Sequence, residues 1–300
     1  MDTASFADLT RRYHRELQVH CYRMLGSFDE AEDHVQEVFL RAWRSRDAFE
    51  ERSSVRTWLY RIATNVCLDT LRRTTPPLQP YPDHLLDESP GPDAVAIGRE
   101  TISLAFLAAI QLLPPRQRAV LILRDVLSWP ASEAAALLGT SVPAANSALQ
   151  RARTTLRERW RGGRLEWAPA AEPDPAEREL LERYIAAHEK ADPEALIDLL
   201  REDVRLTIGP GAGEWTGKAT VARALRQDMN TLGQWRMLPT AANRLPAVGA
   251  YVRGAGDTAF RPFALVVLTP EAGLLAAMDS FETPGLFAAF GLPESLAPTR

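Results

Sequence analysis

The stretch that decides the fold of the first part of the chain is Asp29-Glu-Ala-Glu-Asp-His-Val-Gln-Glu-Val-Phe-Leu-Arg-Ala-Trp43. Its apolar residues recur with the period of an α-helix and form one stripe, made of Ala31, Val35, Val38, Phe39, Ala42 and Trp43. Asp29 is well placed to cap this helix. The opposite face carries Glu30, Asp33, Gln36 and Glu37 around the apolar Leu40. Such a charged face is usually solvated, but acids around an exposed leucine also suit docking onto a basic partner helix.

A second helix is predicted from about Val55 to Arg73. It interleaves aromatic and guanidinium groups with an amide, namely Arg56, Trp58, Tyr60, Arg61, Asn65, Arg72 and Arg73. Aromatic rings stack on unpaired bases and arginines neutralise phosphates, so this combination suits single-stranded DNA. The apolar members, Trp58, Leu59, Ile62 and Val66, also fit a helical core, and we expect most of them to be core and the polar ones to be exposed.

Residues 101–165 end in a helix-turn-helix pattern. Ser128 can cap a helix that contains Ala134, Leu137 and Leu138, and Gly139 can supply the left-handed turn after it. Thr140 or Ser141 can cap the next helix, with Pro143 in its first turn. The buried stripe predicted for that helix is Val142, Ala145, Leu149, Ala152 and Leu156.

The other face of that second helix then points outward and carries Ala144, Ser147, Arg151 and Thr154. Asn146 and Gln150 flank it, and Arg153, Arg157, Arg159 and Arg161 follow. A small and polar first half with a basic tail is typical of a recognition helix in a major groove. A helical hairpin unrelated to DNA is the alternative for such a pattern taken alone.

The formal net charge of −4 conceals a strong asymmetry along the chain. Residues 1–75 are neutral and residues 76–100 carry −4. Residues 101–165 hold nine arginines against three acids, a net charge of +6, whereas residues 166–300 carry −6. The compact basic segment coincides with the helix-turn-helix pattern, which favours the DNA-binding interpretation.

Proline marks the domain boundaries. Residues 76–100 form a Pro-rich acidic linker, and a second break at residues 166–175 contains Pro169, Pro173 and Pro175. We therefore expect three units, at 1–75, 101–165 and 176–300. The apolar stretches are far shorter than a membrane span and the start lacks a signal peptide pattern, so we expect a cytoplasmic protein without a membrane association. Two cysteines, Cys21 and Cys67, make neither a disulfide framework nor a metal cluster, and no cofactor is implied.

The last unit begins with a helix in which Leu181, Tyr184, Ile185 and His188 share a face. Strand-like runs are predicted at Val204–Ile208, Val248–Arg253, Phe260–Leu268 and Leu274–Phe281, with a helix from about Lys218 to Asn230. Helices followed by a meander predict an α+β fold, after two all-α units.

The run at residues 29–43, the run Arg56-Thr-Trp-Leu-Tyr-Arg-Ile-Ala-Thr-Asn65 and the entry Leu113-Pro-Pro-Arg-Gln-Arg-Ala-Val-Leu121 occur in a fixed order. Together they closely resemble bacterial sigma factors of the extracytoplasmic-function branch of the sigma-70 family. The resemblance covers about residues 1–165. It implies that the first unit is region 2, which binds core RNA polymerase and opens and reads the −10 element. The second would be region 4, which reads the −35 element.

This resemblance also implies roles for individual residues. Glu30, Asp33, Gln36, Glu37 and Leu40 would form the polymerase-docking surface. Asn65 would read an extruded −10 base, with Arg56, Trp58 and Arg61 in the strand-opening region. The −35 readout would fall to Ala144, Ser147, Gln150, Arg151 and Arg153. Asn146 and Ala148 stand where many of these factors carry basic side chains, a departure that resembles the subgroup with an extra C-terminal domain.

The third unit resembles the SnoaL-like, nuclear-transport-factor-2-like cone fold, on Tyr184-Ile-Ala-Ala-His-Glu-Lys-Ala-Asp192 and Trp215-Thr-Gly-Lys218. Some members of that superfamily are isomerases or cyclases, and His188 or Asp279 could point into a cavity as a base. A core histidine, a small-molecule ligand in the cavity and an interaction role are the alternatives, and Trp215 and Trp235 are more often core. We expect a sigma factor, not an enzyme, with the last unit acting in cis. The alternative is a SnoaL-like isomerase, cyclase or ligand-sensing domain fused to a DNA-binding tether.

Overall fold

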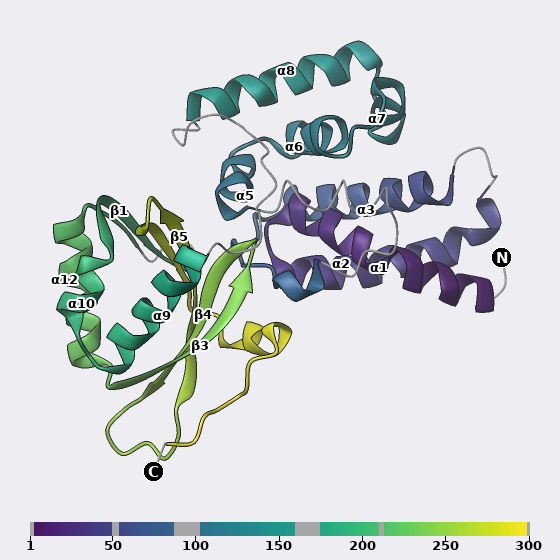
Figure 1. Cartoon of the computed structure of the whole chain (residues 1–300). Coiled ribbons are helices and arrows are strands. Elements are labelled where there is room, and N and C mark those ends of the chain that lie inside the picture. Colours follow the sequence, from purple (N-terminus) through teal and green to yellow (C-terminus); the bar gives the residue numbers. More distant parts are fainter. Residues whose placement is uncertain (1–2, 50–53, 87–102, 160–174, 210–212, 299–300) are drawn as a thin grey trace. The chain divides into compact units, whose positions relative to one another are not determined.

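The computed structural model describes residues 3–49, 54–86, 103–159, 175–209 and 213–298 (Figure 1). These residues fall into two compact units, one within residues 1–79 and 85–169 and the other within 80–84 and 170–300. The two predicted helical units thus share one compact unit. In addition, residues 80–84 of the predicted linker belong to the second. The rest of that linker from residue 87, and most of the 166–175 linker, lie outside the described residues.

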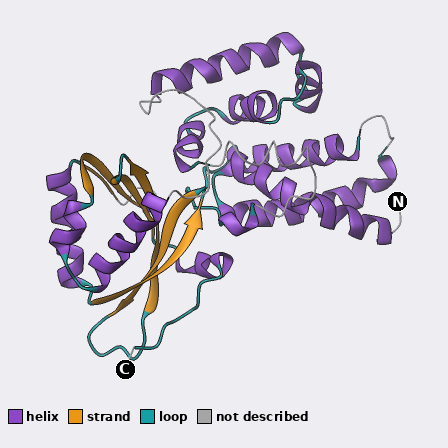
Figure 2. Cartoon of the chain, viewed as in Figure 1, coloured by secondary structure: helices purple, strands orange, loops and turns teal. Residues whose placement is uncertain are grey.

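The first unit is all α-helical, as predicted (Figure 2). Its elements are α1 (Thr3–Leu25), α2 (Phe28–Ser45), the short η1 (Arg46–Ala48), α3 (Val55–Leu71), α5 (Leu104–Gln111), α6 (Pro115–Leu121), the π-helical turn η3 (Ile122–Val126), α7 (Ala131–Leu137) and α8 (Val142–Arg159). Helices α1, α2 and α3 pack on one another, α7 and α8 form the helix-turn-helix, and α6 packs on α8.

The apolar stripe of α2 is buried as predicted, apart from the half-buried Trp43, whose ring meets Phe6 with centroids 5.0 Å apart. The cap differs from the prediction. Ser27, not Asp29, caps α2 by accepting a hydrogen bond from the backbone N–H of Glu30. Asp29 lies in the first turn and accepts from the side-chain amide of Gln79 at 2.9 Å. A partner 50 residues away therefore occupies the carboxylate that local reasoning assigned to the cap.

The helix-turn-helix keeps its predicted turn and second cap. Gly139 adopts φ +60°, which glycine does without strain, and the Ser141 hydroxyl accepts from the Ala144 N–H at 3.3 Å. The first cap was wrong, because α7 begins after Pro130 and Ser128 lies before it with φ +54°. Val142 is 37% exposed, whereas the other four residues of its predicted stripe are buried.

Arg118 of α6 joins the two halves of the first unit. Its side chain is 2% exposed and donates to the carbonyl oxygens of Met24 at 2.6 Å and Gln111 at 2.9 Å. Burial lowers the pKa of its guanidinium to about 10, so the group stays charged at neutral pH. The buried charge is bonded to one carbonyl at the end of α1 and to another at the end of α5, and the bond to α1 holds α6 against the predicted region 2.

The second unit has the predicted α+β fold. Its elements are α9 (Pro175–Glu189), α10 (Pro193–Asp198), β1 (Leu200–Ile208), β2 (Gly213–Thr216), α12 (Lys218–Thr231), β3 (Gln234–Ala242), β4 (Leu245–Arg253), β5 (Arg261–Glu271), β6 (Leu274–Phe281) and the 3₁₀ segment η4 (Pro284–Phe290). The strands form one sheet in the order β2-β1-β6-β5-β4-β3. Neighbours are antiparallel except β1 and β6. The core lies between helices α9 and α12 and one face of this sheet (Figure 2).

A short piece of the predicted linker, residues 80–84, is bound to the β3–β4 hairpin of the second unit. The hairpin loop is Asn243-Arg244, and both residues have positive φ, at 55° and 64°. Tyr81 is fully buried; its N–H donates to Asn243 Oδ1 at 2.8 Å, and its carbonyl accepts from the Asn243 N–H at 3.0 Å. The Arg244 N–H donates to the Asp83 carboxylate at 2.9 Å. We call residues 80–84 the strap.

Replacement of Arg118 tests whether its hydrogen bonds hold α6 against the predicted region 2. Arg118→Leu keeps an apolar stem but leaves two buried carbonyls without their donor, so it should lower the free energy of unfolding by about 2–4 kcal/mol. Arg116→Leu, at an exposed position of the same helix, is the control and should change it by less than about 0.5 kcal/mol. Urea unfolding followed by far-UV circular dichroism measures the free energy of unfolding of both variants. Equal losses in the two variants would contradict a stabilising role of the Arg118 hydrogen bonds.

Candidate nucleic-acid interface

One face of α3 presents the residues predicted to contact single-stranded DNA. Arg61, Asn65 and Arg72 are exposed and lie four and eleven positions apart, which places them on one side of the helix. The core members Leu59 and Val66 are buried as expected, and Ile62 is half-buried. Trp58 is half-buried beside this face, with its ring centroid 4.9 Å from that of Phe49. An exposed amide, two arginines and a partly exposed indole are a suitable surface for unpaired bases and phosphates.

Arg56, one of the predicted −10 residues, already has partners within the chain, as Arg72 has in Asp69 at 2.8 Å. The Arg56 guanidinium binds the Glu16 carboxylate at 2.5 Å, and the Tyr60 hydroxyl donates to the same oxygen at 2.8 Å. Burial acts to lower the pKa of Arg56, but its hydrogen bonds and charge contacts with Glu16 and Tyr60 outweigh burial and raise it. This network ties α3 to α1, so the structure favours a supporting role for Arg56, while direct DNA contact stays a prediction.

The exposed face of α8 carries most of the predicted −35 residues. Ala144, Ser147, Gln150 and Arg151 are all exposed, as are Asn146, Thr154 and Arg157. Ala145, Leu149, Ala152 and Leu156 point the other way and are buried. The small side chains at the start of α8 leave room for close approach to a groove, and the forked donor of Arg151 suits guanine, so this face keeps the predicted −35 role as a prediction.

Arg153 lies two positions after Arg151 and is bound within the chain. Its Nε and one terminal nitrogen donate to the two oxygens of Asp125, at 2.9 and 2.7 Å. This hydrogen-bonded pairing raises the pKa of Arg153. A bidentate bond from η3 to α8 orients the helix, and readout of a base by Arg153 stays a prediction.

The acidic face of α2 is exposed around one leucine. Leu40 is 51% exposed, and Asp33 and Gln36 are exposed beside it. The other two carboxylates are partly engaged: Glu30 lies 3.6 Å from His34, and Glu37 lies 2.6 Å from Arg41. Asp33, Gln36 and Leu40 are therefore the members that a partner can reach without displacing an internal ion pair.

Glu16 and Asp125 engage two of the arginines predicted to contact DNA, Arg56 and Arg153, and sequence reasoning did not single out either acid. They lie 40 and 28 residues from the arginines that they bind. No local period links residues at such separations, so only the tertiary fold reveals these pairs.

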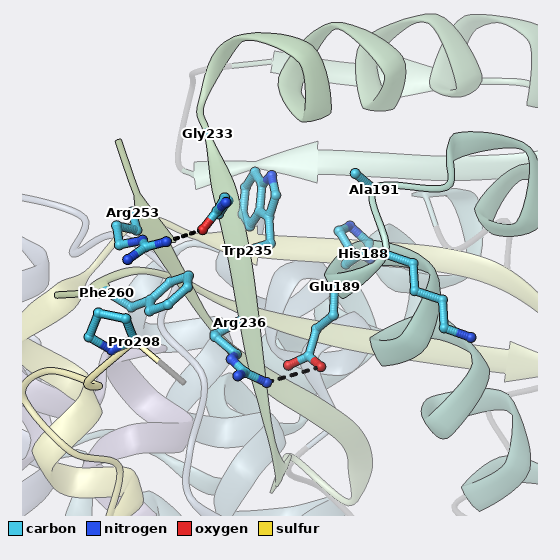
Figure 3. A pocket seen from close by; sticks show the side chains of 11 residues that line it. His188, Glu189, Ala191, Gly233, Trp235, Arg236, Arg253, Phe260 and Pro298 are labelled. Atoms are coloured by element: carbon cyan, nitrogen blue, oxygen red, sulfur yellow. Dashed lines mark hydrogen bonds and ion pairs between the residues drawn. The ribbon is translucent and has the colours of Figure 1, made fainter. Parts of the chain in front are cut away.

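The second unit brings one of its two candidate bases to a cavity. His188 is 5% exposed, and its Nδ1 lies 3.1 Å from the Tyr184 carbonyl oxygen (Figure 3). Burial lowers the pKa of His188 to about 4, so the ring is neutral at pH 7. Asp279 lines neither this cavity nor the hollow that adjoins it. Its neighbours on β6, Met278 and Ser280, line the cavity, and alternate residues of a strand point to opposite faces of the sheet. Trp235 is core, as expected, and also lines the cavity.

Within the part of the chain that the structure describes, no helix has the length and apolar character of a membrane span. The same residues contain no group of three or more His, Cys, Asp or Glu side chains suited to a metal ion.

Comparison with known proteins follows the same division of the chain. Residues 9–76 match the family Sigma-70 region 2, and residues 103–156 match Sigma-70, region 4. The chain is 40% identical to the ECF RNA polymerase sigma factor SigG of Mycobacterium tuberculosis, over 97% of this chain and 85% of that protein. It is 30% identical to SigJ of the same organism, over 92% and 91%.

The crystal structure of the extracytoplasmic-function sigma factor SigJ of Mycobacterium tuberculosis superposes with a TM-score of 0.63 at 24% identity. The match covers 96% of this chain and 99% of that chain, so the similarity of fold includes the second unit as well as the helical one.

Two arginines of α8 allow base reading to be separated from phosphate binding. Arg151→Ala should cost about 1–3 kcal/mol of binding on DNA that carries the recognised base, and should relax preference at one position. Arg157→Ala, farther along the same helix, should weaken binding to all sequences alike and lower the salt dependence. Selection from a randomised duplex pool at two salt concentrations gives both results. Identical sequence profiles for the two variants would show that the recognition face is misplaced.

Proposed function

The chain belongs to the extracytoplasmic-function family of RNA polymerase sigma factors, and we propose that its second unit controls, in cis, how far regions 2 and 4 can separate. A sigma factor binds core RNA polymerase and promoter DNA and starts transcription at specific promoters; it is not an enzyme. The cytoplasm, where RNA polymerase works, is the proposed site of action.

We assign each surface one step of initiation. The exposed part of the α2 face, centred on Asp33 and Leu40, docks onto basic residues of core polymerase. The α3 face with Arg61 and Asn65 holds the opened −10 strand, and α8 reads the −35 element. These assignments rest on exposure, charge and helix face.

We infer from the distance between the −10 and −35 elements that the compact first unit has to open before it binds both of them. Elements about 25 base pairs apart are separated by roughly 85 Å of duplex at about 3.4 Å per base pair. A compact unit of this size has a radius of gyration of only about 15 Å. With Arg118 holding α6 to the Met24 carbonyl, α3 and α8 lie too close together to reach both elements. Binding of both elements therefore requires the Arg118 contacts to break.

The strap is the observation that carries the cis-control proposal. Residues between regions 2 and 4 form part of the second unit, through Tyr81, Asp83 and the Asn243-Arg244 loop. A bound strap shortens the stretch of chain that is free to extend between the two regions. The 18 residues from 85 to 102 reach at most about 60 Å when fully extended, whereas release of residues 80–84 adds about 17 Å. The second unit thereby sets the reach of region 4.

The alternative, an isomerase or cyclase joined to a DNA-binding tether, has less support. The relatives that match this chain over most of its length are RNA polymerase sigma factors. Of the two candidate bases, only His188 lies at the cavity.

Reversal of one charge tests polymerase docking. Asp33→Arg places like charges against a basic partner surface and should weaken core polymerase binding at least tenfold, and Leu40→Ser should add to the loss. Asp8→Arg, also exposed and reversed in charge but on α1, is the control. Competition with a labelled sigma factor for core polymerase measures affinity, and circular dichroism checks the fold. Unchanged binding by Asp33→Arg would identify the face as merely solvated.

Two glycine substitutions in one loop test the strap. Asn243→Gly removes the side-chain acceptor for Tyr81 while glycine suits the positive φ, so the strap should loosen and promoter-specific transcription should rise severalfold. Arg244→Gly relieves the same backbone conformation but keeps Asn243, so it serves as the matched control. Reconstituted transcription with core polymerase at fixed protein concentration compares them. Equal activities of the two variants and the parent would refute control through the strap.

A further inference from the structure

The second unit encloses a cavity of about 250 Å³ between α9, α12 and the sheet. Most of its wall is apolar, including Leu206, Met237, Phe263 and Met278. A cavity of about 150 Å³ is enough for benzene, so this one accommodates a molecule of one or two rings. All of its lining residues belong to the second unit, so the site does not depend on the sigma regions.

One polar group at this cavity is a buried donor without a partner. The indole Nε1 of Trp235 forms no hydrogen bond within the described residues, and the side chain is 9% exposed. Figure 3 shows this nitrogen on the side of the ring that faces away from Arg253 and Phe260. Buried donors are nearly always satisfied, so the N–H marks a position where a ligand acceptor fits.

The neighbouring histidine adds an acceptor. His188 packs edge-on against Trp235, with ring centroids 5.9 Å apart. The ring is neutral, and its Nδ1 donates to the Tyr184 carbonyl, so its Nε2 is the unprotonated nitrogen.

A second feature of the wall is acidic. Asp228 of α12 and Glu282, which follows β6, both line the cavity, and no lysine or arginine is among its described lining residues. Burial, followed by the negative charge of Glu282, raises the pKa of Asp228. A cation placed beside the two carboxylates would relieve both effects.

We propose that this cavity is a binding site for a small aromatic or cyclic amine, whose ammonium group pairs with Asp228 and Glu282 and whose ring system carries a hydrogen-bond acceptor for Trp235. The apolar walls hold the ring. The carboxylates reject anions of the same shape. Control by the strap is not required for this binding, which is measured without polymerase.

An adjoining hollow of about 530 Å³ defines the main alternative (Figure 3). It shares His188 and Trp235 with the cavity but contains Lys190, Arg236 and Arg253, which suit an anion. Two of these cations are already engaged, Arg236 with Glu189 at 3.5 Å and Arg253 with Gln234. The unpartnered indole donor and the carboxylates of the inner cavity therefore favour the amine.

Four probes of one shape separate the contributions to binding on the full chain. Tyramine carries the amine and a phenol oxygen, and phenethylamine lacks the phenol. In 2-(4-hydroxyphenyl)ethanol the amine is replaced by a neutral hydroxyl, and in 3-(4-hydroxyphenyl)propionate by a carboxylate. Isothermal titration calorimetry should rank tyramine first and the propionate last, with about a fivefold loss for each group removed.

Variants of the chain identify the side chain that contacts each group of the probe. Asp228→Asn should weaken tyramine about fivefold or more and leave the alcohol unchanged, whereas the exposed Asp198→Asn should change neither. Trp235→Phe should weaken tyramine about fivefold but phenethylamine less than twofold. Ala264→Met fills the inner cavity and should abolish binding of all probes, and Arg253→Gln in the outer hollow should have no effect. Thermal unfolding confirms that each variant is folded.

Three results would overturn the proposal. The first is binding of the propionate as tight as that of tyramine, with loss on Arg253→Gln, which would place an anion in the outer hollow. The second is tyramine binding that survives Ala264→Met in the folded protein. The third is no heat of binding and no change in thermal midpoint with any probe at about 5 mM.

Discussion

Two anchored residues on either side of Pro80 constrain the passage of the chain from the first unit to the second. Gln79 is fixed to region 2, where its N–H donates to the Gly26 carbonyl and its carbonyl accepts from the Tyr22 hydroxyl. Tyr81 is fixed to the β3–β4 hairpin of the second unit. Only Pro80 separates the two anchored residues along the chain, so the chain passes from the first unit into the second with one residue between the anchors. A change inside the second unit thus has a direct covalent route to the linker between the two DNA-reading regions.

The hydrogen bond from Arg118 to the Met24 carbonyl suits a contact that breaks in the proposed opening of the first unit. The hydrogen bonds of Arg118 go to the carbonyls of Met24 and Gln111, which are neutral groups. If α6 leaves region 2, the guanidinium and the Met24 carbonyl gain water together, and hydration offsets much of the lost hydrogen bond. Had a carboxylate been buried there instead, opening would also separate opposite charges. In the proposed opening, the first unit can therefore yield to polymerase and DNA without the separation of a buried ion pair.

The sequence predicted those features that depend on local periodicity, and it failed where distant partners decide. The α2 stripe and the α8 core were found because burial repeats with the helix itself. The Ser27 cap was missed because Gln79 occupies Asp29. Strand β3 was also missed: it contains Pro239, which argues against a central strand, and β3 lies at the edge of the sheet, where proline is tolerated. Strand β2 has four residues, too few for an alternating pattern.

The same limit applies to the candidate DNA surface, and α8 shows why it matters. Composition alone does not distinguish Arg151 from Arg153. A step of two residues along an α-helix turns the side-chain direction by about 200°, so the two arginines lie on different faces. Arg151 is exposed, whereas Arg153 is bound to Asp125 of η3. The helix therefore uses one arginine to fix its orientation and leaves the other available to a groove. Because these tasks lie on different faces, the DNA sequence preference that we propose for α8 can change by substitution at exposed positions while the Asp125 pairing keeps the helix in place.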